Sequence, residues 1–342
     1  MKYDVTIGIP VYNAESYMSR SMESALSQIY LSIEFLIIDD GCTDASMDIV
    51  RFFQAQYPRG KDIRIISHEK NKGVSAARNR IIDEAAGEYL YFMDADDVIA
   101  DNTIDLLMAG IRQYEAELVF GSYEKINTDG RREVYQYPNQ QLLGEDQLAS
   151  FAYRKYAGIQ ASACNYLVKT SLLRDHHHRF IATDYWEDLV FTFNLVTLVS
   201  RAVLLSDITY TYLCRENSLS HYQQREHISK EEVFKNVHAI EHLKETSSLL
   251  YNKVYFPNRC YNIMMTDFYI ACNILKRRKD IVPSVSDWEI KGLMAHPATF
   301  GQICHFRQSR LKNLALYLLT RLPSRLCVMI IRCMSKIKEL KN

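Results

Sequence analysis

Short apolar runs alternate with amphipathic stretches along the first third of the chain. Four runs are apolar enough to be strands buried on both faces of a sheet: residues 4–10, 33–38, 63–66 and 89–93. Between them, apolar side chains recur at helical spacing in residues 14–27, 44–56 and 74–86. Strands and helices in this alternation predict right-handed βαβ units and a parallel sheet.

Further along the chain the pattern is less regular. It predicts helices over 103–114, 145–156 and 187–199, strands near 118–121, 202–205 and 208–213, and a hairpin turn at 128–131. From residue 229 onward only helical periodicity remains. We therefore expect an α/β domain at residues 1–224 and a helical region at residues 225–342.

Composition and charge narrow the class of protein. Of 342 residues, 48% are hydrophobic and 24% are charged, which is ordinary for a globular protein. The eight cysteines form no CxxC pair or disulfide framework, no signal peptide is evident, and no uncharged apolar stretch reaches the ~18–20 residues of a membrane span. These features predict reduced thiols and a cytoplasmic protein.

Candidate chemistry is densest where the fourth predicted strand ends. The apolar residues 90–93 lead directly into Asp94, Ala95, Asp96 and Asp97. Two like charges ~4 Å apart cost about 1 kcal/mol in water and roughly 4 kcal/mol at an effective dielectric of 20, and a hard cation such as Mg²⁺ or Mn²⁺ removes that cost. From these residues alone, a solvated acidic turn that caps the next helix remains an alternative.

The other predicted strands also end in polar motifs at the same edge of the sheet. Residues 10–13 read Pro-Val-Tyr-Asn, residues 39–41 read Asp-Asp-Gly, and residues 71–79 include Arg78. An aromatic ring, a carboxylate pair, an arginine and an acidic cluster are the groups that a nucleoside diphosphate needs. The glycine-rich motifs of dinucleotide-binding folds and of P-loop proteins are missing after the first strand.

Taken together, these motifs resemble family 2 glycosyltransferases of the GT-A fold. The resemblance covers residues 4–220 and also includes Glu-Asp-Leu-Val-Phe at 187–191 and the segment at 212–221. It implies an open, mostly parallel, Rossmann-like sheet flanked by helices, with a nucleotide-sugar half at about 1–122 and an acceptor half at about 123–224. It also implies a nucleotide-sugar donor, with a UDP-sugar favoured, a Mn²⁺ or Mg²⁺ ion, and inversion at the anomeric carbon.

The resemblance assigns roles on the donor side. Tyr12 would lie against the base in a loop shaped by Pro10 and Asn13, and Asp39 or Asp40 would accept the base N–H. The remaining donor contacts implied are Arg78 near the base or phosphates, Asp94 and Ala95 at the ribose, and Arg215 and Ser218 over the diphosphate. Asp96 would bind the metal, with Asp94 and His221 as further ligands. The residues alone also allow a strand-end turn at Tyr12, a helix cap at Asp39 or Asp40, a surface salt bridge at Arg78 and a surface histidine at His221.

For the chemistry, the resemblance makes Asp188 the general base, and its neighbour Glu187 would orient the loop or cap the helix. A helix cap is the alternative, since a helix N-terminus favours carboxylates. Neither Trp186 nor Trp288 lies in the Gln-x-x-Arg-Trp motif of processive synthases, so we expect transfer of a single sugar to a cell-envelope glycan or lipid-linked oligosaccharide. Two other functions remain: a non-catalytic nucleotide-sugar-binding or scaffold protein of this fold, and a nucleotidyltransferase, although the glycine-rich basic loop of the latter is missing.

Charge is concentrated at the C-terminal end. Residues 301–342 hold nine Lys/Arg and one acid, a net charge of 9 − 1 = +8. One arc of the predicted helix at 326–340 carries Leu326, Met329, Ile330, Cys333, Ile337 and Leu340, flanked by Arg325, Arg332 and Lys336 on one side and Lys338 and Lys341 on the other. This pattern favours contact of residues 311–341 with an anionic membrane surface, on the inner face of the cell membrane. Docking on the catalytic domain or in a homodimer, with Val328 and Ile331 also buried, is the alternative; no nucleic-acid module is present.

Overall fold

The chain folds into two compact units. The computed structural model describes residues 3–154, 159–183, 186–215 and 228–339. Unit 1 comprises Met1–Leu148 and Ala161–Ser218, and unit 2 comprises Ala149–Gln160 and Leu219–Asn342. The division near residue 218 falls close to the boundary expected at 224, but unit 2 also takes a short segment from the middle of the chain.

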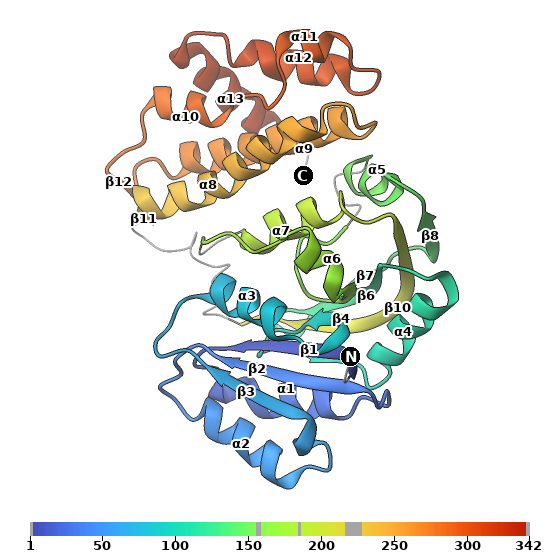
Figure 1. Ribbon diagram of the computed structural model, residues 1–342. Coiled ribbons are helices and arrows are strands. Elements are labelled where there is room, and N and C mark those ends of the chain that lie inside the picture. The colour runs from blue at the N-terminus through green and yellow to red at the C-terminus, as the bar shows by residue number, and fades with distance from the viewer. Residues whose placement is uncertain (1–2, 155–158, 184–185, 216–227, 340–342) are drawn as a thin grey trace. The chain divides into compact units, whose positions relative to one another are not determined.

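The first half of the sheet in unit 1 is parallel. Its strands run in the order β3-β2-β1-β4 and are joined by three helices: β1 (Tyr3–Val11), α1 (Glu15–Leu26), β2 (Ile33–Asp39), α2 (Ser46–Gln56), β3 (Ile63–Ser67), α3 (Val74–Glu84) and β4 (Gly87–Phe92). A 3₁₀ turn, η1 (Gly60–Asp62), precedes β3. Because right-handed connections lead outward from β1 and then back to β4, α1 and α2 cover one face and α3 the other (Figure 1). The strand order therefore reverses between β1 and β4.

The second half of the sheet is mixed rather than parallel. After β4 the order continues β9-β6-β10-β5, and β9 is antiparallel to both of its neighbours. The two strands expected at 202–205 and 208–213 are one long strand with register shifts between Leu204 and Tyr210. The elements of this half are β5 (Val98–Ile99), α4 (Thr103–Tyr114), β6 (Leu118–Ile126), β7 (Arg132–Tyr135), β8 (Gln140–Leu143), β9 (Tyr166–Lys169), α6 (Thr170–Asp175), α7 (Glu187–Leu195) and β10 (Arg201–Leu213). The expected α/β architecture is confirmed, with a more mixed sheet than the sequence pattern predicts.

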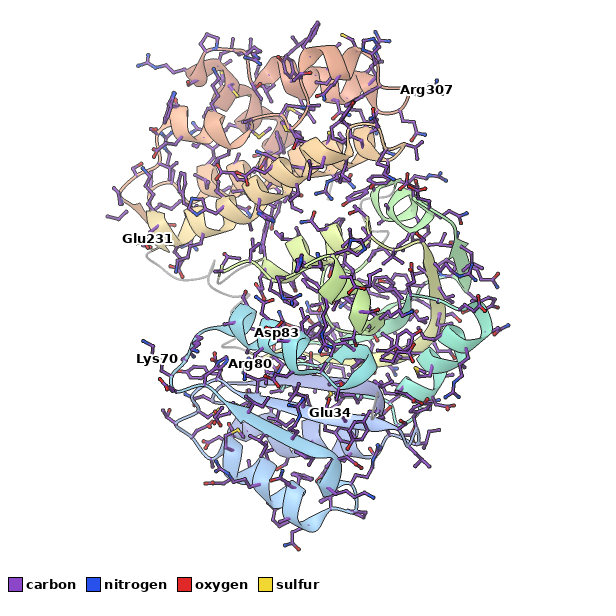
Figure 2. All side chains as sticks on the ribbon, in the orientation of Figure 1. Glu34, Lys70, Arg80, Asp83, Glu231 and Arg307 are labelled. Atoms are coloured by element: carbon purple, nitrogen blue, oxygen red, sulfur yellow. The ribbon has the colours of Figure 1, made fainter. Side chains whose placement is uncertain are left out.

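Helix α3 shows how the hydrophobic pattern places a charged side chain inside unit 1. Ala77, Ile81 and Ile82 are buried against the sheet, whereas Arg80 and Asp83 point outward (Figure 2). Arg78 lies on the buried face and is only 4% exposed. Burying an arginine is costly unless its charge is paired and its N–H groups are hydrogen-bonded. This helix therefore carries a cation that needs partners inside the domain.

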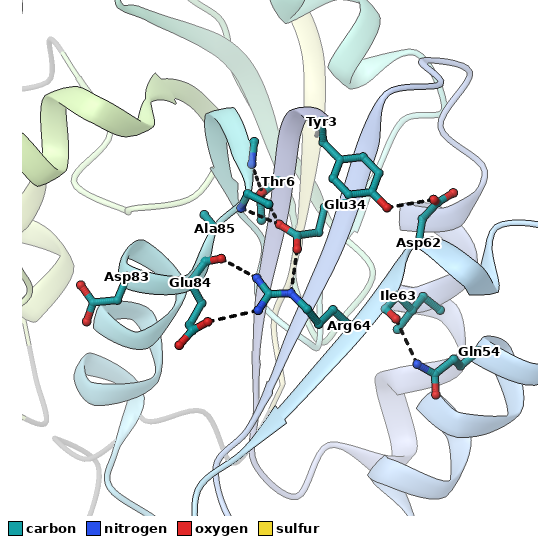
Figure 3. A network of polar contacts seen from close by, with 12 residues as sticks. Tyr3, Thr6, Glu34, Gln54, Asp62, Ile63, Arg64, Asp83, Glu84 and Ala85 are labelled. Carbon is teal, nitrogen blue, oxygen red and sulfur yellow. Dashed lines mark hydrogen bonds and ion pairs between the residues drawn. The ribbon is translucent and has the colours of Figure 1, made fainter. Parts of the chain in front are cut away.

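A network of polar contacts fixes the other end of α3, at the amino-terminal edge of the strands. Arg64 contacts Glu34 at 2.8 Å and Glu84 at 3.1 Å (Figure 3). The buried Glu34 also accepts hydrogen bonds from the Thr6 hydroxyl at 2.6 Å and from the Ala86 N–H at 2.8 Å. Three donors, from Arg64, Thr6 and Ala86, satisfy this carboxylate, so its burial is tolerated. The network ties β1, β2 and β3 to the end of α3 on the side opposite the carboxyl ends of the strands.

Unit 2 is helical. Helix α9 packs against α8, α10, α12 and α13. The elements after residue 227 are β11 (Ile228–Ser229), α8 (Lys230–Ser247), η3 (Ser248–Leu250), α9 (Phe256–Lys276), β12 (Ile281–Val282), α10 (Asp287–Leu293), α11 (Phe300–Cys304), α12 (Arg310–Leu319) and α13 (Ser324–Glu339). The sequence pattern predicts no strands here, but β11 and β12 form a two-residue parallel pair. In the part of the chain that the structure describes, no helix has both the length and the apolar character needed to cross a bilayer.

A fully buried arginine joins the mid-chain segment to unit 2. Helix α5 (Gln147–Arg154) carries Tyr153, whose hydroxyl accepts a hydrogen bond from Arg259 of α9. Arg259 also donates to the Ser247 hydroxyl at 2.7 Å and to the Leu243 carbonyl at 3.2 Å. The rings of Tyr153 and Tyr255 stack with centroids 5.6 Å apart. These contacts explain why 149–160 belongs to unit 2.

Candidate active site

Three strands of unit 1 end side by side at its candidate site. Val11 at the end of β1 pairs with Asp39 at the end of β2, and Gly8 pairs with Phe92 at the end of β4. The strand order reverses between β1 and β4, and ligands of open α/β sheets bind at such a reversal, outside the carboxyl ends of the strands. The motifs at 10–13, 39–41 and 94–97 therefore converge as the sequence predicts.

The loop after β1 presents one free aromatic ring. Tyr12 is 51% exposed, whereas Pro10 is still inside the β1–β2 pairing. Asn13 adopts a left-handed backbone (φ 46°), and its side-chain oxygen accepts the Thr43 N–H at 2.8 Å. Asn13 thus ties the loops after β1 and β2 together, and Tyr12 is the group of this motif that can stack on a planar ligand.

Asp40 organises the loop that leads into α3. It is buried, and its carboxylate accepts the N–H groups of Lys72 and Gly73, both at 2.9 Å. His68 Nδ1 lies 2.7 Å from the same carboxylate. This set of contacts fixes residues 68–73 against the end of β2.

Asp39 is the more accessible carboxylate of the pair. It is half-buried and accepts the Cys42 N–H at 2.9 Å and the Ser67 hydroxyl at 3.0 Å. Gly41 follows in a left-handed conformation (φ 76°), where a Cβ would lie 2.7 Å from the Asn71 backbone nitrogen. The glycine of Asp-Asp-Gly is therefore required for the two loops to approach each other.

Arg78 bridges the two acidic motifs. Its Nη2 lies 2.9 Å from Asp94 Oδ1, and its Nη1 lies 3.0 Å from Glu187 Oε1. Burial opposes the charged form, but Asp94 and Glu187 raise the pKa of Arg78 well above its usual value. The guanidinium also lies 5.4 Å from the centre of the Phe180 ring. The alternative of a surface salt bridge at Arg78 is wrong, because its paired guanidinium is buried inside the domain.

The two carboxylates at the start of α7 have different surroundings. Glu187 is buried and paired with Arg78, and burial followed by the charge of Asp188 raises its pKa. Asp188 is half-buried and accepts the Leu189 N–H at 2.7 Å. Burial also raises the pKa of Asp188, and Arg78 opposes that shift. Among the described residues Asp188 forms no ion pair, so it is the carboxylate of the two that is available to a ligand.

Each carboxylate of the 94–97 motif has a different partner. Asp94 pairs with Arg78, and Asp96 Oδ2 lies 2.8 Å from Arg215 Nε. Asp97 is buried and accepts the Tyr210 hydroxyl at 2.6 Å. Burial and the neighbouring carboxylates raise the pKa values of Asp96 and Asp97. Ala95 is buried between them. Because each carboxylate has its own partner, the repulsion among these three neighbouring carboxylates is reduced.

The motif suits a cation that shares its ligands with a phosphate. No cluster of three or more His, Cys, Asp or Glu side chains able to enclose a metal ion occurs within the described ranges. A Mg²⁺ or Mn²⁺ ion in a nucleotide site, however, needs only one or two carboxylates, with phosphates and water completing its shell. Asp94 and Asp96 are partly exposed, and a guanidinium already lies against Asp96. This donor set therefore fits a divalent ion with a diphosphate.

Two contacts of the site are not predicted by the sequence pattern. The Arg215 guanidinium lies 5.3 Å from the centre of the Tyr17 ring on α1, and the buried Tyr210 holds Asp97. Period-two alternation in β10, which puts Tyr210 and Tyr212 on one face, was the available signal for Tyr210. Ser218 and His221, expected at the diphosphate and metal, lie outside the described residues.

Known proteins similar to this chain are glycosyltransferases. The model of "Glycosyl transferase family 2" matches residues 6–172. Among curated proteins, glycosyltransferase GlyG of Streptococcus pneumoniae is 27% identical over 222 residues, which is 63% of this chain and 72% of GlyG. The Escherichia coli protein WfgD, named a UDP-Glc:alpha-D-GlcNAc-diphosphoundecaprenol beta-1,3-glucosyltransferase, is 32% identical over 127 residues, 37% of this chain and 48% of WfgD. The chain thus spans about half the length of WfgD.

One solved structure shows the same fold over nearly the whole chain. It is Staphylococcus aureus TarS 1–349 in complex with UDP-GlcNAc. The TM-score is 0.57 at 17% identity, and the match covers 93% of this chain and 90% of the TarS chain.

Proposed function

We propose that this chain, which belongs to glycosyl transferase family 2, moves one sugar from a nucleotide-sugar to an acceptor hydroxyl with inversion at the anomeric carbon. The observation that carries the proposal is the buried bridge through Arg78. It joins Asp94 to Glu187, residues that are far apart in the sequence, and so holds a donor-side carboxylate next to the Glu187-Asp188 pair. Leaving-group stabilisation and proton abstraction require those two groups in one site.

On the donor side, the exposed Tyr12 ring stacks on the base, and Asp39, the more accessible carboxylate of the Asp39-Asp40 pair, accepts the base N–H. Asp94 and Ala95 lie at the ribose. A UDP-sugar is the favoured donor, because WfgD is named for UDP-Glc and TarS was solved with UDP-GlcNAc. The strand order β2-β1-β4 is compatible with this assignment, because it puts the groups proposed for the base on one side and the 94–97 motif on the other.

In the transfer step, Asp188 acts as the general base. Its carboxylate takes the proton of the acceptor hydroxyl as that oxygen attacks the anomeric carbon, and the bond to the nucleoside diphosphate breaks. A single displacement inverts the configuration. Glu187 is engaged by Arg78 and positions the start of α7, whereas Asp188 is available and has a raised pKa, which improves a base at neutral pH.

The leaving group is a diphosphate, and cations stabilise it. A Mn²⁺ or Mg²⁺ ion at Asp96 and Asp94 would supply Lewis-acid charge to the departing oxygens. Arg215 is the protein's own cation at this position, since it lies against Asp96. In this proposal Ser218 also contacts the diphosphate and His221 is a further ligand of the metal ion.

The acceptor is a cell-envelope glycan or a lipid-linked oligosaccharide, and the protein acts at the inner face of the membrane. The name of WfgD, which includes a diphosphoundecaprenol acceptor, supports a lipid-linked substrate. A non-catalytic scaffold would not need a second carboxylate, that of Asp188, half-exposed beside the buried, paired Glu187. A nucleotidyltransferase would need the glycine-rich loop that is missing after β1.

A thermal-shift screen of nucleotide sugars, with and without Mn²⁺, tests the proposal. A donor present at 100 times its Kd stabilises the protein by about 2.7 kcal/mol, which raises Tm measurably. We expect one nucleoside diphosphate family to shift Tm and the shift to grow with metal. If no nucleoside diphosphate or nucleotide sugar raises Tm with metal present, the donor-site assignment is wrong.

A further inference from the structure

The C-terminal part of unit 2 carries cations without counter-charges in its own sequence. From residue 290 to residue 338 there is no Asp or Glu. The same 49 residues contain nine basic side chains: Lys291, Arg307, Arg310, Lys312, Arg321, Arg325, Arg332, Lys336 and Lys338. A run of this length with a net charge of +9 has to be solvated or matched by charge from outside the segment.

Helix α13 has two apolar faces, and only one of them is buried. Cys327, Val328 and Ile331 pack into unit 2 and are almost inaccessible. Leu326 and Met329 lie on a different arc and are 39% and 54% exposed. The buried face packs on α9 and α10 within unit 2, whereas Leu326, Met329 and Cys333 of the predicted arc are exposed and Ile330 is half-buried.

Helix α12 repeats the arrangement. Leu316 and Leu319 face the interior, while Leu311 and Leu318 are 79% and 51% exposed. The exposed Ala315 lies between the latter two at helical spacing, so they form one apolar stripe along the helix. Leu311 and Leu318 therefore give α12 an exposed apolar stripe of its own.

Cations border both exposed stripes. Arg325 and Arg332 are each one turn of α13 from Met329 and are exposed. Lys312 adjoins Leu311 on α12, and Arg321 follows Leu318 by three residues, again exposed. Arg307, just before α12, also projects from unit 2 (Figure 2). Apolar side chains bordered by Arg and Lys, with no acid among them, are typical of helices that lie in the headgroup region of an anionic bilayer.

The charge also decides between candidate occupants. A second copy of this chain would bring the same positive surface to a two-fold interface, and the cations would repel. A neutral protein surface would leave these cations unmatched. An anionic lipid surface provides dispersed negative charge for the arginines and an apolar layer for the leucines and Met329.

We propose that the exposed faces of α12 and α13 dock this protein on membranes that contain anionic phospholipids. The apolar stripes enter the boundary between headgroups and acyl chains, and the bordering arginines and lysines contact lipid phosphates. The link to catalysis rests on the proposed function, because a lipid-linked acceptor would be presented at such a surface. The docking itself does not depend on it.

Vesicle flotation of the full-length protein tests the docking. One set of vesicles is phosphatidylcholine alone and the other is phosphatidylcholine mixed with phosphatidylglycerol. We expect flotation only with the mixed vesicles, and a loss of flotation as salt is raised. Equal binding to both vesicle sets, or none to either, overturns the proposal.

Paired variants locate the surface. The double change Arg325→Gln and Arg332→Gln should weaken binding about thirtyfold, whereas Arg51→Gln with Lys61→Gln removes the same charge from unit 1 and should change little. Leu311→Ser with Leu318→Ser should abolish flotation, and Leu249→Ser with Val254→Ser is the matched apolar control. All eight positions are exposed, so folding is preserved, which the melting curves verify.

Two further outcomes separate the hypotheses. If the wild type forms a dimer without lipid and Leu311→Ser with Leu318→Ser makes it monomeric, the face belongs to a second copy and the docking proposal fails. If flotation and its variants behave as expected but no nucleotide sugar shifts Tm, the proposed function fails and the docking stands.

Discussion

The Nε of Arg215 lies 2.8 Å from the Oδ2 of Asp96, so the carboxylate expected to hold a metal ion already has a cation beside it. The guanidinium rests over the ring of Tyr17. A divalent ion at Asp96 therefore has to compete with an arginine of the same chain. A bound diphosphate offers Arg215 another anionic partner, so donor and metal would favour each other's binding.

This competition gives the first prediction. Arg215→Gln should strengthen Mn²⁺ binding to the nucleotide-free protein roughly three- to tenfold, because Asp96 loses its competing cation. Asp96→Asn should abolish that binding. The free Mn²⁺ signal in electron paramagnetic resonance measures both without any assay of turnover. Unchanged Mn²⁺ affinity in the Arg215 variant would show that the ion does not use Asp96.

The assignment of Asp188 as the general base is tested by comparing its variant with that of the neighbouring Glu187. Asp188→Asn should lower kcat by roughly 10²–10⁴-fold while donor affinity stays within a few-fold, because a base acts on the acceptor. Glu187→Gln should lower kcat less if, as proposed, Glu187 only positions the helix start. Single-turnover transfer at saturating donor, with donor binding measured separately, distinguishes them. A larger loss in Glu187→Gln than in Asp188→Asn would reverse the assignment.

The bridge through Arg78 predicts a large effect on stability. Arg78→Met leaves Asp94 and Glu187 without their buried cation and should cost about 3–5 kcal/mol of unfolding free energy. Adding Glu187→Gln should restore part of that loss, because one unpaired carboxylate is removed. Urea unfolding of the two single variants and the double variant measures the coupling. Strictly additive losses would mean that the pair contributes nothing as a pair.

Asp267 of α9 predicts a pH dependence of stability. Burial raises its pKa from 3.8 to about 7, against the opposing effect of Lys244 at 2.5 Å. The folded protein thus holds a proton that the unfolded chain releases. Its stabilising effect is complete below 3.8 and is lost as pH rises to about 7.

Asp267→Asn should therefore flatten the fall in unfolding free energy over this pH range, by at most about 1.4 kcal/mol per pH unit. Urea unfolding at a series of pH values compares the two proteins, and Asp207→Asn, at an exposed position, serves as the control. Parallel pH profiles of wild type and Asp267→Asn would contradict the shifted pKa.

Local pattern is sufficient to predict the first half of unit 1. The strands β1 to β4 are continuous apolar runs and the helices between them are amphipathic, so both the parallel sheet and the convergence of Tyr12, Asp39 and Asp94 follow from short-range information. The site residues at the strand ends could be found for the same reason.

Contacts between distant segments could not be found in this way. Arg78 and Glu187 are 109 residues apart, and nothing near either residue indicates that the other is its partner. The antiparallel insertion of β9 between β4 and β6 depends on which strand edges remain open after the first half has formed. The assignment of 149–160 to unit 2 depends on Arg259, which is equally remote.

The contact between Tyr153 and Arg259 also has a consequence for the order of synthesis. The two residues are 106 positions apart, and a ribosome that adds about 5–20 residues per second needs roughly 5–20 s to cover that distance. During this interval the strands and helices of 161–218 emerge and can complete unit 1, while the segment 149–160 has no helix α9 to pack on. The nascent chain therefore carries Ala149, Ala152 and Tyr153, all buried in the finished protein, in the open until the second unit is made. A fragment that ends near residue 218 would keep them exposed permanently, so a catalytic fragment cut there should aggregate unless these three positions are made polar.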